Sequence, residues 1–323
     1  MHDAAPQRKT PARDRPRERH RLAVAALLVA NVALAFGPWF VRVADVGPVA
    51  SAFWRITLAA PLLAGLALAS GARPARLPGG LWWLLALGGV AFAADLASWH
   101  VGILHTKLAN ATLLGNSAIL MFPIWGFMVA RAWPTRTQGW ALALAAAGAA
   151  LLLGRSYQLD PRQLLGDLLC LAAGVLYTVY FIVMTRARER MAPLSSLALS
   201  TAASILPLLA VALLLGERVW PGDWTPLIGL ALVSQVVGQG CMIYALGLLP
   251  PLVVGIALLI QPVVTGTIGW IVYGERLGAL DLLGAAMVAA ALVLVRRSPE
   301  NLAPQNLAPE PPTPHLDTAR NRG

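Results

Sequence analysis

The chain has 323 residues, of which 58% are hydrophobic and 12% charged, and its mean hydropathy is +0.66. Soluble domains carry about 25% charged residues, so this composition excludes an ordinary soluble protein and is typical of a polytopic membrane protein. The net charge of +10 does not indicate a nucleic-acid partner, because Lys and Arg concentrate in the tails and loops, where they fit lipid headgroups and orientation signals.

Residues 1–21 are a basic tail in which we expect no stable structure. The apolar run after it resembles the core of a signal peptide over Leu22–Ala30, with a cleavage-like site at Ala33–Ala35. Because the run stays apolar to Val41 and further apolar runs follow, we favour a first membrane span.

Ten segments have the roughly 20 apolar residues that a membrane helix needs, and breaks rich in Gly, Pro and charge separate most of them. They predict an all-α polytopic membrane protein with ten transmembrane helices. The predicted spans are 22–41, 47–69, 81–103, 108–130, 138–154, 164–185, 194–216, 226–248, 251–273 and 278–295. Residues 298–323 form a Pro-rich tail in which we expect no structure.

The spans form an internal repeat. A shift of about 143 residues lays the first five spans, 22–154, on the last five, 164–297. Residue identity across this shift is weak, so the repeat rests on matching lengths and breaks. Five is an odd number, so the second half must enter the membrane from the opposite side, which predicts an inverted-topology repeat as found in transporters.

The basic residues set the expected orientation. The loops on the two sides carry nearly equal numbers of Lys and Arg, whereas both tails are basic. Since Lys and Arg favour the cytoplasmic side, we expect both termini in the cytoplasm of a multi-pass protein of the cell (inner) membrane.

Two charged residues, Arg55 and Asp95, lie inside predicted spans. From their positions along oppositely running helices, at about 1.5 Å per residue, both should lie at a similar depth toward the outer side. An ionisable group at that depth is a candidate functional residue. We expect Arg55 and Asp95 to line one central cavity and to pair across it. The alternatives are a fixed salt bridge that only orders the helices, or an Arg55 that reaches the headgroups.

His100 follows Asp95 by five positions, which places it about 140° around the helix. It could titrate near neutral pH and relay a proton with Asp95. An equally good interpretation is a histidine that is hydrogen-bonded near the outer interface. The spacing does not fit a metal-binding pair.

Several amide side chains lie in the fourth, eighth and ninth predicted spans. Their depth predicts a pocket for a polar small molecule, although Asn and Gln also bond helices to one another in lipid. These residues are Asn110, Asn116, Gln235, Gln239 and Gln261.

Aromatic residues adjoin these polar positions. Trp54, Trp99, Tyr177 and Tyr180 could wall the pocket or bind a cation through their rings. The alternative is ordinary packing between helices.

Other chemistry finds no support in the sequence. Cys170 and Cys241 lie in apolar runs and are interpreted as small buried hydrophobic residues. Walker loops, GxSxG turns and metal-spaced His, Cys or Asp clusters are missing from the sequence, so we expect no cofactor, no metal and no enzyme activity.

Four short motifs resemble the drug/metabolite transporter superfamily of the EamA type, and the resemblance covers residues 22–297. The motifs are FWR at 53–55, ANATLL at 109–114, QPVV at 261–264 and GER at 274–276. The chain departs from the usual pattern at Ile119, where many members have proline, and at Ala132, where many have glutamate. The resemblance implies a pocket between two five-helix halves and, by analogy, export of amino acids, metabolites or toxic compounds.

We therefore predict a secondary transporter that moves a small polar or amphipathic metabolite by alternating access. The predicted substrate-binding residues are Arg55, Asp95, Trp99, Asn116, Tyr177, Gln235, Gln239 and Gln261. Asp95 and His100 are the candidates for proton coupling. The expected partners are a small molecule and the lipid bilayer, with the protein a monomer or homodimer. The alternatives are a membrane-embedded lipid-modifying enzyme and a non-transporting scaffold.

Overall fold

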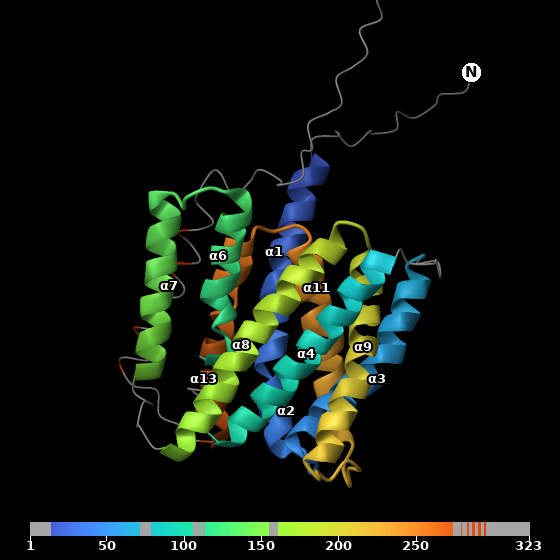
Figure 1. Cartoon of the computed structure of the whole chain (residues 1–323). Helices are drawn as coiled ribbons and strands as arrows, with labels where there is room; N and C mark the ends of the chain where they lie inside the picture. Colours follow the sequence, from blue (N-terminus) through green and yellow to red (C-terminus); the bar gives the residue numbers. More distant parts are fainter. Residues whose placement is uncertain are drawn as a thin grey trace, which may run out of the picture.

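A computed structural model describes residues 14–71, 79–105, 111, 114–154 and 161–273, together with single positions between 279 and 294. Within these residues all regular elements are helices (Figure 1). In chain order they are α1 (Asp14–Ala35), α2 (Gly37–Val43), α3 (Pro48–Ala69), α4 (Gly79–His105), α6 (Ala118–Ala130), α7 (Arg136–Gly154), α8 (Pro161–Arg188), α9 (Pro193–Leu214), α10 (Thr225–Gly229), the π-helix η1 (Leu230–Gln239), α11 (Gly240–Leu246), α12 (Pro251–Ala257) and α13 (Ile260–Tyr273).

Seven helical segments of the described chain are long and apolar enough to cross a membrane, and α6 is a shorter apolar helix. The seven correspond to the first, second, third, sixth, seventh, eighth and ninth predicted spans. The fifth prediction corresponds to α7. Most of the tenth, both tails up to residue 13 and beyond 297, and Asn110 lie outside the described residues. For the described residues, the prediction of an all-helical protein with several helices long and apolar enough to cross a membrane is confirmed.

The outward faces of the helices carry large apolar side chains. Trp83 is 76% exposed, Met128 71% and Leu206 74%. Such surfaces are unfavourable in water but are expected where lipid is the solvent. The apolar residues that predicted the spans therefore face lipid in some positions and the protein core in others.

The first helix differs from its prediction at both ends. It begins at Asp14, inside the segment for which we expected no stable structure, so that expectation was wrong for residues 14–21. Arg and Glu are good helix formers, and Pro16 is tolerated because it lies in the first turn. At the other end the span is divided near Phe36, and α2 begins with Gly37 and Pro38.

The fourth and ninth spans are broken at equivalent places. α6 begins only after a turn at Asn116 and Ser117, and α13 begins after a turn at Leu258 and Leu259. Under the 143-residue shift the two breaks coincide to within one residue. α6 packs on α12, and a Cβ added at Gly255 would lie 2.6 Å from the Pro123 Cγ atom. The two interrupted spans therefore cross in close contact.

The first and second halves of the chain meet mainly where α4 packs against α8 and α9, and where α3 packs against α9. Gly88 and Gly89 permit this approach. A Cβ at Gly88 would lie 2.8 Å from Val183 Cγ1, and one at Gly89 would lie 2.4 Å from Ala203 Cβ. The Ser204 hydroxyl also donates to the Gly89 carbonyl at 2.8 Å. This interface holds the polar residues described next.

Candidate functional site

Arg55 lies inside the bundle and is 3% exposed. It lies seven residues, or about two turns, into α3. Its Nε donates to Gln235 Oε1 at 3.0 Å, and Gln235 Nε2 donates in turn to Thr201 Oγ1 at 3.2 Å. These bonds join α3 of the first half to η1 and α9 of the second. A guanidinium away from water needs such partners, so Arg55 depends on the second half for its position.

Asp95 lies on α4 and is 8% exposed. It lies close enough to Arg55 for the two side chains to interact electrostatically, but they do not form a direct ion pair in the described structure. No hydrogen bond from a described residue reaches its carboxylate either. An ionised carboxylate can accept about four hydrogen bonds. Asp95 is therefore free to accept donors from a ligand.

An aromatic wall borders these charges. The Arg55 guanidinium carbon lies 5.9 Å from the centre of the Phe92 ring. Phe92 stacks on Tyr180 with centroids 4.4 Å apart, and Tyr177 lies 6.0 Å from Tyr180 in a parallel arrangement. The negative ring faces favour a cation, so the wall helps to hold the Arg55 charge and offers a surface for an apolar ligand.

Two polar atoms beside the wall keep unused hydrogen-bonding capacity. Gln239 Nε2 donates to the Tyr177 hydroxyl at 3.2 Å, whereas Gln239 Oε1 has no partner among the described residues. The Tyr180 hydroxyl lies close to Ser200 without the geometry of a hydrogen bond. Buried polar atoms are usually satisfied, so unpartnered ones are a feature of ligand sites.

The π-helical form of η1 is relevant to this arrangement. Gln235 and Gln239 lie four residues apart on η1, close to one turn, and both are buried. π-helical segments are rare and often occur at functional sites. We call Arg55, Phe92, Asp95, Tyr177, Tyr180, Gln235 and Gln239 the polar cluster.

His100 lies outside the polar cluster, on another side of α4. Its Nδ1 donates to the Pro48 carbonyl at 2.8 Å and lies 3.1 Å from Ser51 Oγ. Its Nε2 is buried without a partner among the described residues. The structure therefore places His100 against the first turn of α3, as in the interpretation of a hydrogen-bonded histidine.

The other predicted site residues lie elsewhere. Trp99 Nε1 donates to the Ala111 carbonyl at 3.2 Å, and Asn116 lies in the break before α6, 7% exposed. Gln261 Nε2 donates to Asn31 Oδ1 at 3.0 Å, which joins α13 to α1. No described contact links these three residues to Arg55 or Asp95.

Two residues near Arg55, Phe92 and Thr201, were not predicted as site residues from the sequence. Phe92 precedes Asp95 by three positions and so shares its helix face, a signal that could have found it. Thr201 adjoins a row of buried serines spaced by four residues on α9, namely Ser196, Ser200 and Ser204. Hydroxyls repeated at helical spacing within an apolar span indicate a face that is turned toward the protein interior.

A loop of the second half closes over the start of α3. We call residues 215–224, between α9 and α10, the strap. The Glu217 carboxylate accepts the Val49 N–H at 3.2 Å and the Ala50 N–H at 2.7 Å. Gly47 N–H also donates to the Arg218 carbonyl at 3.0 Å. A residue from the other half thus caps α3, at amides that have no partner within the helix.

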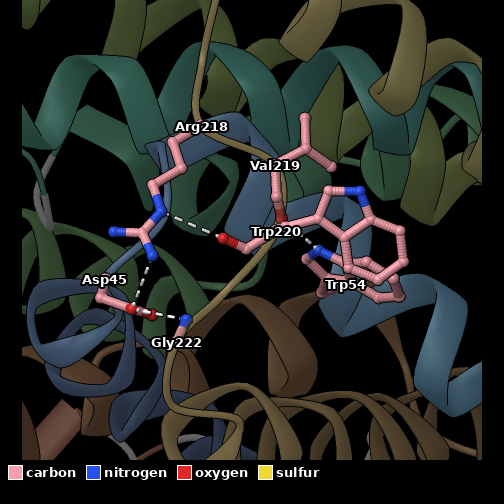
Figure 2. A network of polar contacts seen from close by, with 6 residues as sticks. All are labelled: Asp45, Trp54, Arg218, Val219, Trp220 and Gly222. Carbon is pink, nitrogen blue, oxygen red and sulfur yellow. Dashed lines mark hydrogen bonds and ion pairs between the residues drawn. The ribbon is translucent and has the colours of Figure 1, made fainter.

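The strap makes further contacts at the same end, as Figure 2 shows. The Gly222 N–H donates to Asp45 Oδ2 at 2.7 Å, and Arg218 pairs with the same oxygen at 3.6 Å. Trp54 Nε1 donates to the Val219 carbonyl at 2.7 Å. Trp54 also packs against Trp220 and Trp224, with centroids 5.4 and 4.8 Å away. Because Trp54 adjoins Arg55, the strap closes the end of the bundle nearest the polar cluster.

We expect Glu217→Ala to lower the free energy of unfolding by about 1–2 kcal/mol, because two amides of the first turn of α3 lose their acceptor. Thermal and chemical unfolding in detergent would measure this. Glu18→Ala, at an exposed position on α1, is the matched control and should change stability by no more than about 0.5 kcal/mol. Equal losses in the two variants would contradict a capping role.

Comparisons with known proteins agree with this architecture. The EamA-like transporter family matches the chain twice, over residues 21–154 and 164–297. Two proteins of Archaeoglobus fulgidus, each described as an uncharacterized transporter, are 29% identical over 143 residues and 27% identical over 208 residues. The matches span 43% and 62% of this chain, and 48% and 72% of the relatives. A crystal structure with 18% identity superposes with a TM-score of 0.68 over 87% of this chain and 98% of its own, which shows a shared fold.

Proposed function

The chain belongs to the EamA-like transporter family, as the sequence motifs predicted, and on that premise we propose that it is a secondary carrier of a small polar or amphipathic metabolite. It works by alternating access and in the export direction, in the inner membrane with both termini cytoplasmic. Ten spans in two inverted halves remain our expectation for the complete membrane domain. In this topology the strap lies on the outer side of the membrane, opposite to the two termini.

The observation that supports the proposal best is the polar cluster. A guanidinium and a carboxylate lie near each other between the two halves, inside the bundle, and the carboxylate has no described donor. Burial of both charges is unfavourable unless other groups compensate. A substrate with hydrogen-bond donors can supply partners to Asp95, and the aromatic wall can cover its apolar part.

The paired breaks in the fourth and ninth spans support the same proposal. Discontinuous helices are common around the substrate sites of secondary transporters, because their free backbone groups and flexible turns lie at mid-membrane. Here the breaks at Asn116 and Leu258 lie in helices that cross one another. Rocking of one half against the other would bend the chain at these positions.

The test is transport by the purified protein in sealed vesicles, with a panel of radiolabelled amino acids and related metabolites, with and without a pH gradient. We expect at least one compound to move faster than in empty vesicles. Asp95→Asn should lower that rate about tenfold or more, because a charged hydrogen-bonding group contributes about 1.5–3 kcal/mol. If Asp95 couples transport to protons, the variant should also lose any response to the gradient.

Glu18→Gln is the control, since Glu18 is an exposed carboxylate on α1, outside the strap and the polar cluster. It should transport at the wild-type rate. A panel that moves no faster than through empty vesicles would contradict a metabolite carrier. A folded Asp95→Asn variant with the wild-type rate would remove Asp95 from the site.

A further inference from the structure

A second polar site lies at the opposite end of the molecule from the strap. The start of α4 and the end of α8 lie at the end of the bundle where α1 begins (Figure 1), and residues there line a partly open cavity of about 220 Å³. It lies between one helix of each half, far along α4 from Asp95. Its lining residues are Gly80, Leu81, Leu84, Arg186, Glu189 and Arg190.

The arginines at the end of α8 divide into two kinds. Arg188 is structural, because its Nε donates to the Ile243 carbonyl at 3.2 Å and its Nη1 donates to the Met191 carbonyl. Arg186, in the last turn of α8, and Arg190, in the turn that follows the helix, both line the cavity. Both are exposed, and neither side chain forms a hydrogen bond or ion pair with a residue that the structure describes. Two guanidiniums beside one cavity favour a phosphate, which they can bind with bidentate geometry.

An apolar stripe leads away from the cavity along α4. Trp83, Leu87 and Val90 are 76%, 54% and 51% exposed, and their spacing of four and three residues places them on one helix face. Gly80, one turn before Trp83, lines the cavity itself. Exposed tryptophans of membrane proteins lie at the level of the headgroups. A molecule with a phosphate in the cavity would therefore have space for an acyl chain along this stripe.

We propose that this cavity binds the phosphodiester headgroup of a phospholipid. Arg186 and Arg190 donate to the phosphate oxygens, and one acyl chain lies along the Trp83–Val90 stripe. Glu189 would repel a bare anion, but its carboxylate can accept a hydrogen bond from a hydroxyl of the headgroup. This favours a glycerol headgroup over a choline headgroup, which has no donor. Basic pockets between membrane helices bind anionic headgroups in this way.

The test uses the full-length protein, freed of lipid in detergent, with dioleoyl phosphatidylglycerol, dioleoyl phosphatidylcholine and inorganic phosphate as separate probes. Native mass spectrometry and a titration of thermal stability would report binding. We expect phosphatidylglycerol to bind and to raise the unfolding temperature. Arg186→Gln/Arg190→Gln should weaken its binding about tenfold or more, the effect of losing about 1.4 kcal/mol.

Arg136→Gln is the matched control, because Arg136 is an exposed arginine at the start of α7 that does not line the cavity, and it should bind as the wild type does. Arg186→Lys/Arg190→Lys keeps both charges, so it should retain part of the affinity, and it serves if the glutamine variant does not fold. Equal phosphatidylglycerol binding by the wild type and the glutamine variant would overturn the proposal. So would inorganic phosphate binding as tightly as the lipid, because the cavity would then be a site for free anions.

Discussion

Arg55→Gln should slow transport of the identified substrate in sealed vesicles by about tenfold to a hundredfold while the protein remains folded. Arg55 supplies a positive charge to the polar cluster, and its guanidinium donates to Gln235 and lies over the Phe92 ring. Hydrogen bonds of charged groups contribute about 1.5–3 kcal/mol, and each 1.4 kcal/mol corresponds to a factor of ten. The glutamine amide can still donate to Gln235, so the contact between halves is partly kept.

A lysine at the same position separates charge from geometry. Arg55→Lys keeps the charge but loses the planar fork of the guanidinium, so we expect a rate between those of the wild type and the glutamine variant. Arg136→Gln, on the surface of α7, should transport normally. Gel filtration and thermal unfolding would show that each variant is folded. If the transport rate of Arg55→Gln is within about twofold of the wild-type rate, Arg55 has no role in transport. Its buried charge then only orders the helices.

A reversible cross-link between the strap and the α2–α3 loop should stop transport. In the alternating access that we propose, the strap separates from the start of α3 when the site opens outward. Asp45→Cys/Gly222→Cys places two thiols where the Asp45 carboxylate now accepts the Gly222 backbone N–H at 2.7 Å. A Cβ built at Gly222 lies 2.8 Å from Asp45 Oδ2, so the two positions are close enough for a disulfide to be tried there. Oxidation should abolish transport in both directions, and a reductant should restore it.

The controls distinguish the effect of the cross-link on transport from the effect of the two cysteine substitutions. Each single cysteine variant, oxidised in the same way, should keep transporting, which also tests the native Cys170 and Cys241. Substrate should still bind to the cross-linked protein from the cytoplasmic side, because the polar cluster is unchanged. A fully cross-linked protein that transports at the wild-type rate would show that the strap does not move in the cycle. That result would not contradict the proposed substrate site.

A lipid bound in the cavity at Arg186 and Arg190 would also affect the transport rates measured in both experiments. Arg186 lies in the last turn of α8, the helix that also carries Tyr177 and Tyr180 of the polar cluster, and Arg190 lies in the turn that follows it. Bound lipid would therefore hold the C-terminal end of a helix that also contributes to the polar cluster. Vesicles for the transport experiments should have one defined lipid composition, so that variants are compared at equal occupancy of this cavity.

The amino-acid sequence by itself predicted most of the helical spans and the interior position of the charged residues. A run of about 20 apolar residues has one stable form in lipid, because every backbone N–H and C=O must be paired within the segment. The same constraint makes Arg55 and Asp95 costly against lipid, so their interior position could be predicted without knowing their neighbours. The breaks were less evident, since Asn116 and Leu258 lie in runs that are continuous by composition.

Only the tertiary structure decided which polar groups meet. Gln235 and Gln261 are alike in the sequence, yet Gln235 binds Arg55 whereas Gln261 binds Asn31 on α1. Glu217 is a loop acid by its pattern, and it caps a helix that begins 169 positions earlier in the chain, across the two halves. The physical reason is that apolar periodicity and lipid contact act locally along one helix. Hydrogen bonds between helices depend on their relative rotation and depth, which are fixed by close packing at positions such as Gly88 and Gly89.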